Sequence, residues 1–100
     1  MDKYIITVKL LAGADPQAVN SQLQGIISEI DAKESYAVEN VYALAGGTGY
    51  VITLDAADAS CATMALMALT MGGKTTATVS HVMSTDAYGG YLVNPLGNKK

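Results

Sequence analysis

Apolar and polar residues follow two different periods in the first third of the chain. From Tyr4 to Leu11 they alternate with a period of two, which is typical of a β-strand. Asp15-Pro16 then favours a helix start, because the aspartate can accept hydrogen bonds from free amides and proline is tolerated in the first turn. The residues up to Ala32 carry apolar side chains at spacings of three and four. This pattern predicts a helix whose buried stripe comprises Val19, Leu23, Ile26, Ile27 and Ile30.

The same order of periods recurs in the rest of the chain. Two further runs alternate with a period of two, and the glycine-rich segment 46–49 between them has the backbone freedom that a tight turn needs. Asp58 precedes an apolar run that Gly72-Gly73 ends, and a threonine-rich run follows. These signals predict strands over 36–45, 50–55 and 74–84 and a helix from Asp58 to about Met71.

The predicted order, strand-helix-strand repeated twice, is that of a ferredoxin-like fold. The predicted class is α+β, with a βαββαβ unit and a four-stranded antiparallel sheet forming a single domain over residues 1–88. Helices cover only one face of such a sheet, so the other face is either wet or covered by a partner. That face is predicted to carry Ile5, Thr7, Lys9, Thr76, Thr78 and Ser80. This half-polar mixture suits a sheet-on-sheet dimer.

The last residues, 89–100, are predicted to form a tail without a helix. Gly89, Gly90 and Pro95 all disfavour helical structure. The tail nevertheless carries several apolar side chains, where a free tail is expected to be polar. A free tail and a tail that packs on a partner subunit both remain open at this point.

Two glycine-containing segments superficially resemble nucleotide-binding loops. A phosphate-binding loop follows a strand and opens a helix whose amides point at the anion. Segment 46–49 opens a strand instead, and Gly73-Lys74-Thr75 follows a helix. The first segment is therefore predicted to be a turn and the second a helix stop.

Composition narrows the class of protein. One hundred residues correspond to one domain with a thin core. Half of the residues are apolar and only 15% are charged, which is more apolar than a small monomer needs and favours a homodimer or higher oligomer. The formal net charge of −3 argues against nucleic acid as a partner.

Signals for membranes, disulfides and metals are absent from the sequence pattern. No apolar run approaches the roughly 20 residues of a membrane span, and the first residues enter a strand without a signal-peptide core. Cys61 has no second cysteine to pair with, and one histidine and one cysteine offer no ligand spacing for a metal. We expect a cytoplasmic protein with no membrane partner, no metal and no cofactor.

His81 is the one side chain expected to titrate near neutrality. Alternation in the fourth strand places it with Ala77, Val79 and Met83 on the face turned toward the helices. It either packs as a core or edge residue, or it lines a pocket between sheet and helices and acts as an acid, a base or a hydrogen-bond donor. It is the best candidate for a catalytic residue, although the sequence assigns none.

Tyrosines on the strands and methionines on the second helix are the other candidates for that pocket. Packing is the simpler role for each ring, and Met64, Met67 and Met71 recur at the spacing of an ordinary packed helix stripe. Cys61, in the first turn of the second helix, is interpreted as a small buried residue in preference to a reactive thiol. The predicted ligand-binding residues are Tyr4, Tyr42, Tyr50, Met64 and His81.

Several short motifs of the chain are shared with one known family. They are Lys3-Tyr4-Ile5, the run 41–46, the segment 51–58, Ala68-Leu69, residues 75–78 and Tyr88. On these motifs the chain resembles the GYD domain family from about Lys3 to Tyr88. The resemblance implies a dimeric α/β barrel, in which two ferredoxin-like subunits pack their sheets together, and it implies no agreed biochemical activity. The chain departs from the family at Thr48-Gly49, where members usually have Tyr-Asp.

Three functions are compatible with these residues. The first is a dimer that binds a small organic molecule in a pocket between sheet and helices. The second is a cofactor-free enzyme, an oxygenase or isomerase, in which His81 transfers a proton. The third is a structural assembly subunit. The sequence names neither a ligand nor a reaction.

Overall fold

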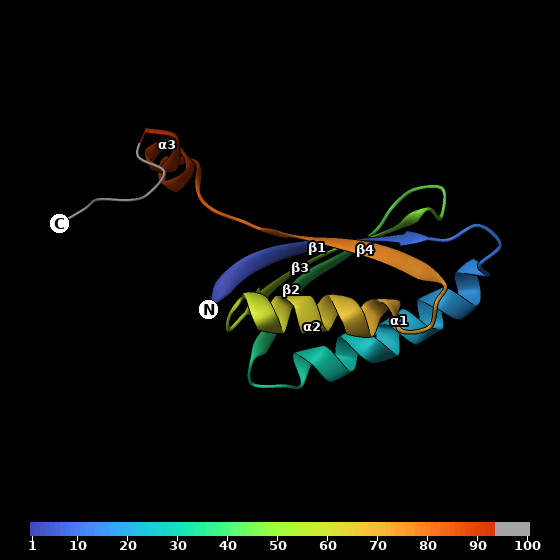
Figure 1. Ribbon diagram of the computed structural model, residues 1–100. Helices are drawn as coiled ribbons and strands as arrows, with labels where there is room; N and C mark the ends of the chain where they lie inside the picture. Colours follow the sequence, from blue (N-terminus) through green and yellow to red (C-terminus); the bar gives the residue numbers. More distant parts are fainter. Residues whose placement is uncertain (94–100) are drawn as a thin grey trace.

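The computed structural model describes residues 1–93 and shows a four-stranded sheet with two helices on one face (Figure 1). A third helix stands apart from this body, beyond the end of the last strand. The elements in chain order are β1 (Asp2–Leu10), α1 (Pro16–Asp31), β2 (Tyr36–Ala43), β3 (Gly49–Ala56), α2 (Ala59–Thr70), β4 (Thr75–His81) and α3 (Thr85–Val93).

The strands lie in the order β2-β3-β1-β4, and each neighbouring pair is antiparallel. Helix α1 connects β1 to β2, and α2 connects β3 to β4, so each helix crosses the same face of the sheet. This is the predicted α+β, ferredoxin-like arrangement with a four-stranded antiparallel sheet. The prediction of the fold class is confirmed.

The hydrophobic core lies between the sheet and the two helices. Alternate side chains of a strand point to the same face, so every second residue of β1 and β3 enters this layer. Helix α1 adds the stripe predicted from its periodicity, with Val19, Leu23 and Ile27 buried and Ile26 and Ile30 packed at its edge. The strand residues of the core are Tyr4, Ile6, Val8, Tyr50, Ile52, Leu54 and Ala56.

Helix α2 buries a different stripe from the one that its methionines suggested. Its buried residues are Ala62, Ala65 and Leu69. Met64, Met67 and Met71 are not packed against the sheet, and their exposed fractions are 62%, 59% and 81%. The prediction of a packed methionine stripe is therefore wrong. Both sets of residues share helical spacing, and the small alanines are the ones that let α2 approach the sheet closely.

Asp58 caps α2 as predicted. Its carboxylate accepts a hydrogen bond from the Cys61 amide at 2.9 Å, and this bond lowers the pKa of Asp58 below its ordinary value. At the start of α1 the Asp15 carboxylate accepts a hydrogen bond from the Gln17 amide at 3.2 Å. In both helices the cap satisfies an amide that has no partner within the helix.

Replacing Asp58 with alanine is expected to lower the midpoint of thermal unfolding near neutral pH, and the loss should disappear in acid. A carboxylate whose pKa is lowered by folding adds stability above its unfolded pKa, here 3.8, and loses it as pH falls through the folded value. Thermal unfolding of wild type and Asp58→Ala between about pH 7 and about pH 2 measures this difference. A difference that is the same at both ends of the range would contradict the capping role. Asp2→Ala, at an exposed position in β1, is the control.

The glycine-rich segment between β2 and β3 is a hairpin connection, as predicted. Gly46 and Gly47 have φ values of 90° and 70°, in the region that favours glycine. The Leu44 amide donates to the Gly49 carbonyl at 2.8 Å and closes the hairpin. Gly73, with φ of 74°, follows the end of α2, which confirms the predicted helix stop.

Helix α3 contradicts the prediction that the residues after Tyr88 avoid helical structure. Gly89 and Gly90 lie inside it, and the predicted domain end at residue 88 falls within it. Asp86 in the first turn favours a helix start, a signal that counting glycines overlooked. The sheet itself ends with β4 at His81. The remaining part of the predicted tail, 94–100, lies outside the described residues.

The face of the sheet away from α1 and α2 is not covered by either helix (Figure 1), and we call it the open face. The register places Ile5 opposite Ser80, Thr7 opposite Thr78 and Lys9 opposite Thr76. These six residues therefore share one face, as predicted. Tyr42 lies on the same face, because β3 residue Val51 pairs with both Tyr42 and Thr7.

Candidate functional site

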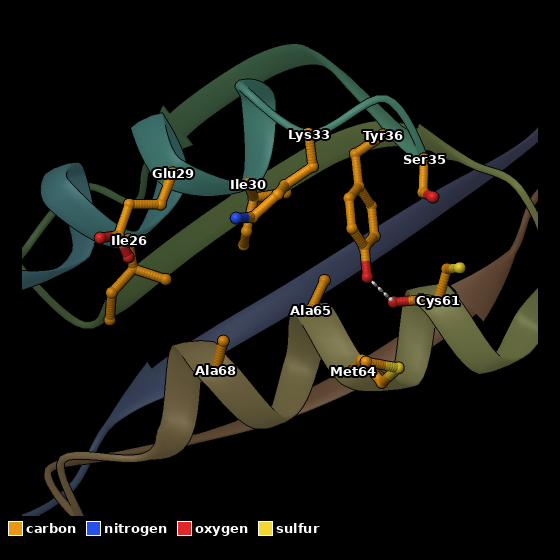
Figure 2. Close-up of a pocket in the computed structure, with 10 residues that line it drawn as sticks. All are labelled: Ile26, Glu29, Ile30, Lys33, Ser35, Tyr36, Cys61, Met64, Ala65 and Ala68. Atoms are coloured by element: carbon orange, nitrogen blue, oxygen red, sulfur yellow. Dashed lines mark hydrogen bonds between the residues drawn. The ribbon is translucent and has the colours of Figure 1, made fainter.

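A groove of about 350 Å³ lies between α1 and α2, next to the start of β2 (Figure 2). Ile26 and Ile30 of α1 form one wall. Met64, Ala65 and Ala68 of α2 form the other. Sites for small molecules are typically concave and mainly apolar, with volumes of about 300–1,000 Å³. The groove has both properties.

The alanines of α2 explain why the two helices leave a space between them. Ala65 is buried and Ala68 is half-buried, and each side chain is a single methyl group that cannot fill the distance to the facing helix. The isoleucines of α1 approach from the opposite side (Figure 2). A larger side chain at Ala68 would therefore occupy the groove.

Tyr36 stands at one end of the groove. It is the first residue of β2, and its hydroxyl donates a hydrogen bond to the Cys61 carbonyl at 2.7 Å (Figure 2). Burial raises the pKa of the Tyr36 phenol above its ordinary value, and the neighbouring Cys61 adds to the shift. The phenol is therefore protonated at neutral pH, and its bond to Cys61 joins the start of β2 to the first turn of α2. Cys61 itself is half-buried, not fully buried as the sequence suggested.

Polar groups border the groove on the side of α1. Glu29 lies in the last turn of α1, Lys33 follows the end of the helix, and both are exposed. Ser35, in the connection to β2, adds a hydroxyl group. The mouth of the groove thus offers a carboxylate, an ammonium group and a hydroxyl beside an apolar interior.

Tyr4 and His81 form a stacked pair away from the groove. Their ring centroids are 4.9 Å apart and their planes meet at 26°. The two residues are directly opposite in the register of β1 and β4, so His81 lies on the helix-facing side, as expected from alternation. Because it is the last residue of β4, however, its side chain is exposed. Burial raises the pKa of the Tyr4 phenol above its ordinary value.

The other predicted site residues are scattered. Tyr50 is buried, and its hydroxyl donates to the Asn20 side-chain oxygen at 2.7 Å, which ties β3 to α1. Tyr42 lies on the open face with 54% of its surface exposed. Met64 alone of the five borders the groove. The expectation that the three tyrosines share one space is wrong, because the register of β2 turns Tyr42 to the opposite side of the sheet from Tyr4 and Tyr50.

Apart from Met64, the residues that form the groove were not identified as site residues from the sequence. Tyr36 and Cys61 are 25 positions apart, and alanines carry no functional signal of their own. One signal was available, because α2 contains no charged residue although one of its sides faces outward. A surface helix usually carries charged residues on its outer side.

Residues 1–93 contain neither a cluster of metal-ligating side chains nor a helix that could span a membrane. No group of three histidine, cysteine or carboxylate side chains in this range is arranged to hold a metal ion. None of the helices described is long and apolar enough to cross a membrane.

Comparison with known proteins supports the fold and no more. Neither a protein-family model nor a curated protein matches the chain. A crystal structure of a glutamate-to-alanine mutant of another protein superposes with a TM-score of 0.59 and 19% sequence identity. The match covers 84% of this chain and 51% of the other, so the chain spans about half the length of that protein. At this identity, the similarity is one of fold: the chain adopts an α+β, ferredoxin-like fold.

Proposed function

We propose that the protein binds a small organic molecule in the groove between α1 and α2. The observation that carries this proposal is the groove of about 350 Å³, with apolar walls and a polar mouth. The site differs from the pocket between sheet and helices that the sequence suggested. Tyr4, Tyr50 and the aliphatic core residues pack into that layer.

The lining favours a ligand with an apolar body and one polar end. Ile26, Ile30 and Ala68 offer no hydrogen-bonding side chain, so the body of the ligand is held by burial alone. The flexible side chain of Met64 adapts to irregular shapes. The polar end of the ligand pairs with Lys33 or Glu29 at the mouth, where water also reaches.

Two experiments test the proposal. Native mass spectrometry of the purified protein tests for a bound small molecule, and the affinity for the anionic aromatic dye 1-anilinonaphthalene-8-sulfonate tests the groove as the binding site. The dye has an apolar ring system and one anionic group, which matches the groove and Lys33. Ala68→Leu is expected to weaken dye binding at least about tenfold, equivalent to about 1.4 kcal/mol, because the added side chain fills the groove.

Thr63→Leu is the matched control for this experiment. It adds an apolar side chain to an exposed position of α2 that does not border the groove. Its dye affinity is expected to stay within about twofold of wild type, a difference of less than 0.5 kcal/mol by the same conversion. Equal affinities for wild type and Ala68→Leu would show that the dye binds elsewhere and would remove the groove as the site.

The alternative of a cofactor-free enzyme depends on His81, which does not border the groove. Its ring stacks on Tyr4 at the exposed end of β4. A substrate acted on by His81 would have to bind at this end of the sheet, outside the groove. The arrangement therefore favours binding in the groove over proton transfer by His81.

We also propose that the protein is a homodimer whose subunits pack their open faces together. Ile5 and Val51 are only half-buried there, and Tyr42 is exposed. Helix α3 lies on the same side of the sheet as the open face (Figure 1), and Leu92 and Val93 are 60% and 86% exposed. A second copy against this side would cover both the sheet and the apolar residues of α3.

A further inference from the structure

The two ends of the open face carry opposite net charges. At one end, Lys3 contacts the Glu39 carboxylate at 2.5 Å and the Asp55 carboxylate at 3.9 Å, so one ammonium group faces two carboxylates. At the other end of β1 is Lys9, which has no ion pair with any residue of the described part of the chain. The first end has a net charge of −1 and the second a net charge of +1.

These two ends are too far apart to neutralise each other within one chain. Lys9 lies six positions after Lys3 along β1, which corresponds to about 20 Å. The screening length at physiological ionic strength is about 8 Å. Each end of the open face therefore acts on a partner as a separate charge.

A shallow depression of about 330 Å³ surrounds Lys9. Thr7, Thr76 and Thr78 line it together with the lysine. Hydroxyl groups and an ammonium group are all hydrogen-bond donors, and a carboxylate is an acceptor with two oxygens. The depression thus fits acidic side chains such as those at the opposite end of the same face.

Two copies can bring their open faces together around a two-fold axis in two ways. An axis that runs along the strands places each end of the face on its own counterpart, so Lys9 lies near Lys9 and the carboxylates lie near carboxylates. An axis that runs across the strands exchanges the ends and places each Lys9 on the acidic end of the other copy. Like charges at an interface are unfavourable, and opposite charges fix its register.

We infer that the open face docks a second copy of this chain with its strand ends exchanged, so that Lys9 of each copy faces Glu39 and Asp55 of the other. This inference rests on the proposed homodimer and adds its orientation. The two-fold symmetry produces the charged contact twice. The uncharged residues between the two ends, Ile5, Thr7 and Val51 among them, form the centre of the contact.

Charge reversal in sedimentation-velocity experiments tests the orientation. Lys9→Glu places like charges in both contacts of a homodimer and is expected to raise the dissociation constant at least about tenfold. Asp55→Lys has the same effect for the same reason. An equimolar mixture of Lys9→Glu and Asp55→Lys chains is expected to form a heterodimer with near wild-type affinity, because both of its contacts then join opposite charges.

Lys33→Glu is the control, because it changes the net charge equally but lies on the helix side of the sheet. Its dissociation constant is expected to match that of wild type. A wild-type dimer that Lys9→Glu does not weaken, or a mixture that fails to form heterodimer, would overturn the orientation and leave the homodimer standing. A wild-type protein that stays monomeric would overturn both, and the groove proposal would be unaffected.

Discussion

Replacing Gly49 with alanine is expected to lower the free energy of unfolding by about 3 kcal/mol or more. Gly49 is buried at the start of β3, opposite Lys9 in the register with β1. A methyl group there would collide with the Val8 carbonyl oxygen and would lie 3.1 Å from the Lys9 Cα. Both are main-chain atoms of the central strand, so β1 and β3 would have to separate. Urea unfolding at a fixed protein concentration measures the change.

Gly25→Ala is the control for this prediction. Gly25 lies in the middle of α1, is exposed, and has no neighbouring atom within 4 Å of the position of the added methyl group. Alanine is the better helix former, so this variant is expected to be more stable than wild type by about 0.5–1 kcal/mol. If Gly49→Ala changed the free energy by less than about 0.5 kcal/mol, the close approach of the two strands would be disproved.

Replacing Leu54 with alanine is expected to cost about 2–5 kcal/mol of unfolding free energy. Its side chain is only 1% exposed, and it lies on β3 between Tyr4 of β1 and Val38 of β2. Removing most of the side chain loses its burial and leaves a cavity that the surrounding sheet and helices can only partly close. The same urea unfolding experiment reports the change.

Met67→Ala is the matched truncation for Leu54→Ala. Met67 also carries a large apolar side chain, but it is 59% exposed on the outer side of α2. Its replacement is expected to change the free energy of unfolding by no more than about 0.5 kcal/mol. Similar losses in the two variants would mean that the core does not lie between the sheet and the helices.

Local signals in the sequence were sufficient to predict the order of elements. Alternation identified the four strands, and spacings of three and four identified α1. Asp15 and Asp58 marked the helix starts and Gly73 the end of α2, and the structure confirms these ends. These signals act between neighbours in the chain, so they can be interpreted without the fold. The exception is α3, where glycines outweighed the favourable Asp86 in the prediction.

The candidate groove could not be predicted in the same way. Its lining includes Tyr36 of β2, Ile26 of α1 and Ala68 of α2, and these residues come from three elements. None of the three has a chemical signature that distinguishes it from a packing residue. The tyrosines that were predicted to bind a ligand lie apart, because strand register decides the face on which each ring lies. A shift of one residue in the register moves every side chain of a strand to the opposite face.

The sequence by itself determined the class of fold and the residues that β1 and β4 place on the open face. Both follow from periodicity, since alternate residues of a strand share a face whatever packs against it. Only the tertiary structure decided which stripe of α2 is buried, that Tyr42 and Tyr50 lie on opposite faces of the sheet, and that a groove remains between the helices. The reason is physical: each of these features depends on the distance and register between elements, and these are set by how the side chains of all elements fill one common core.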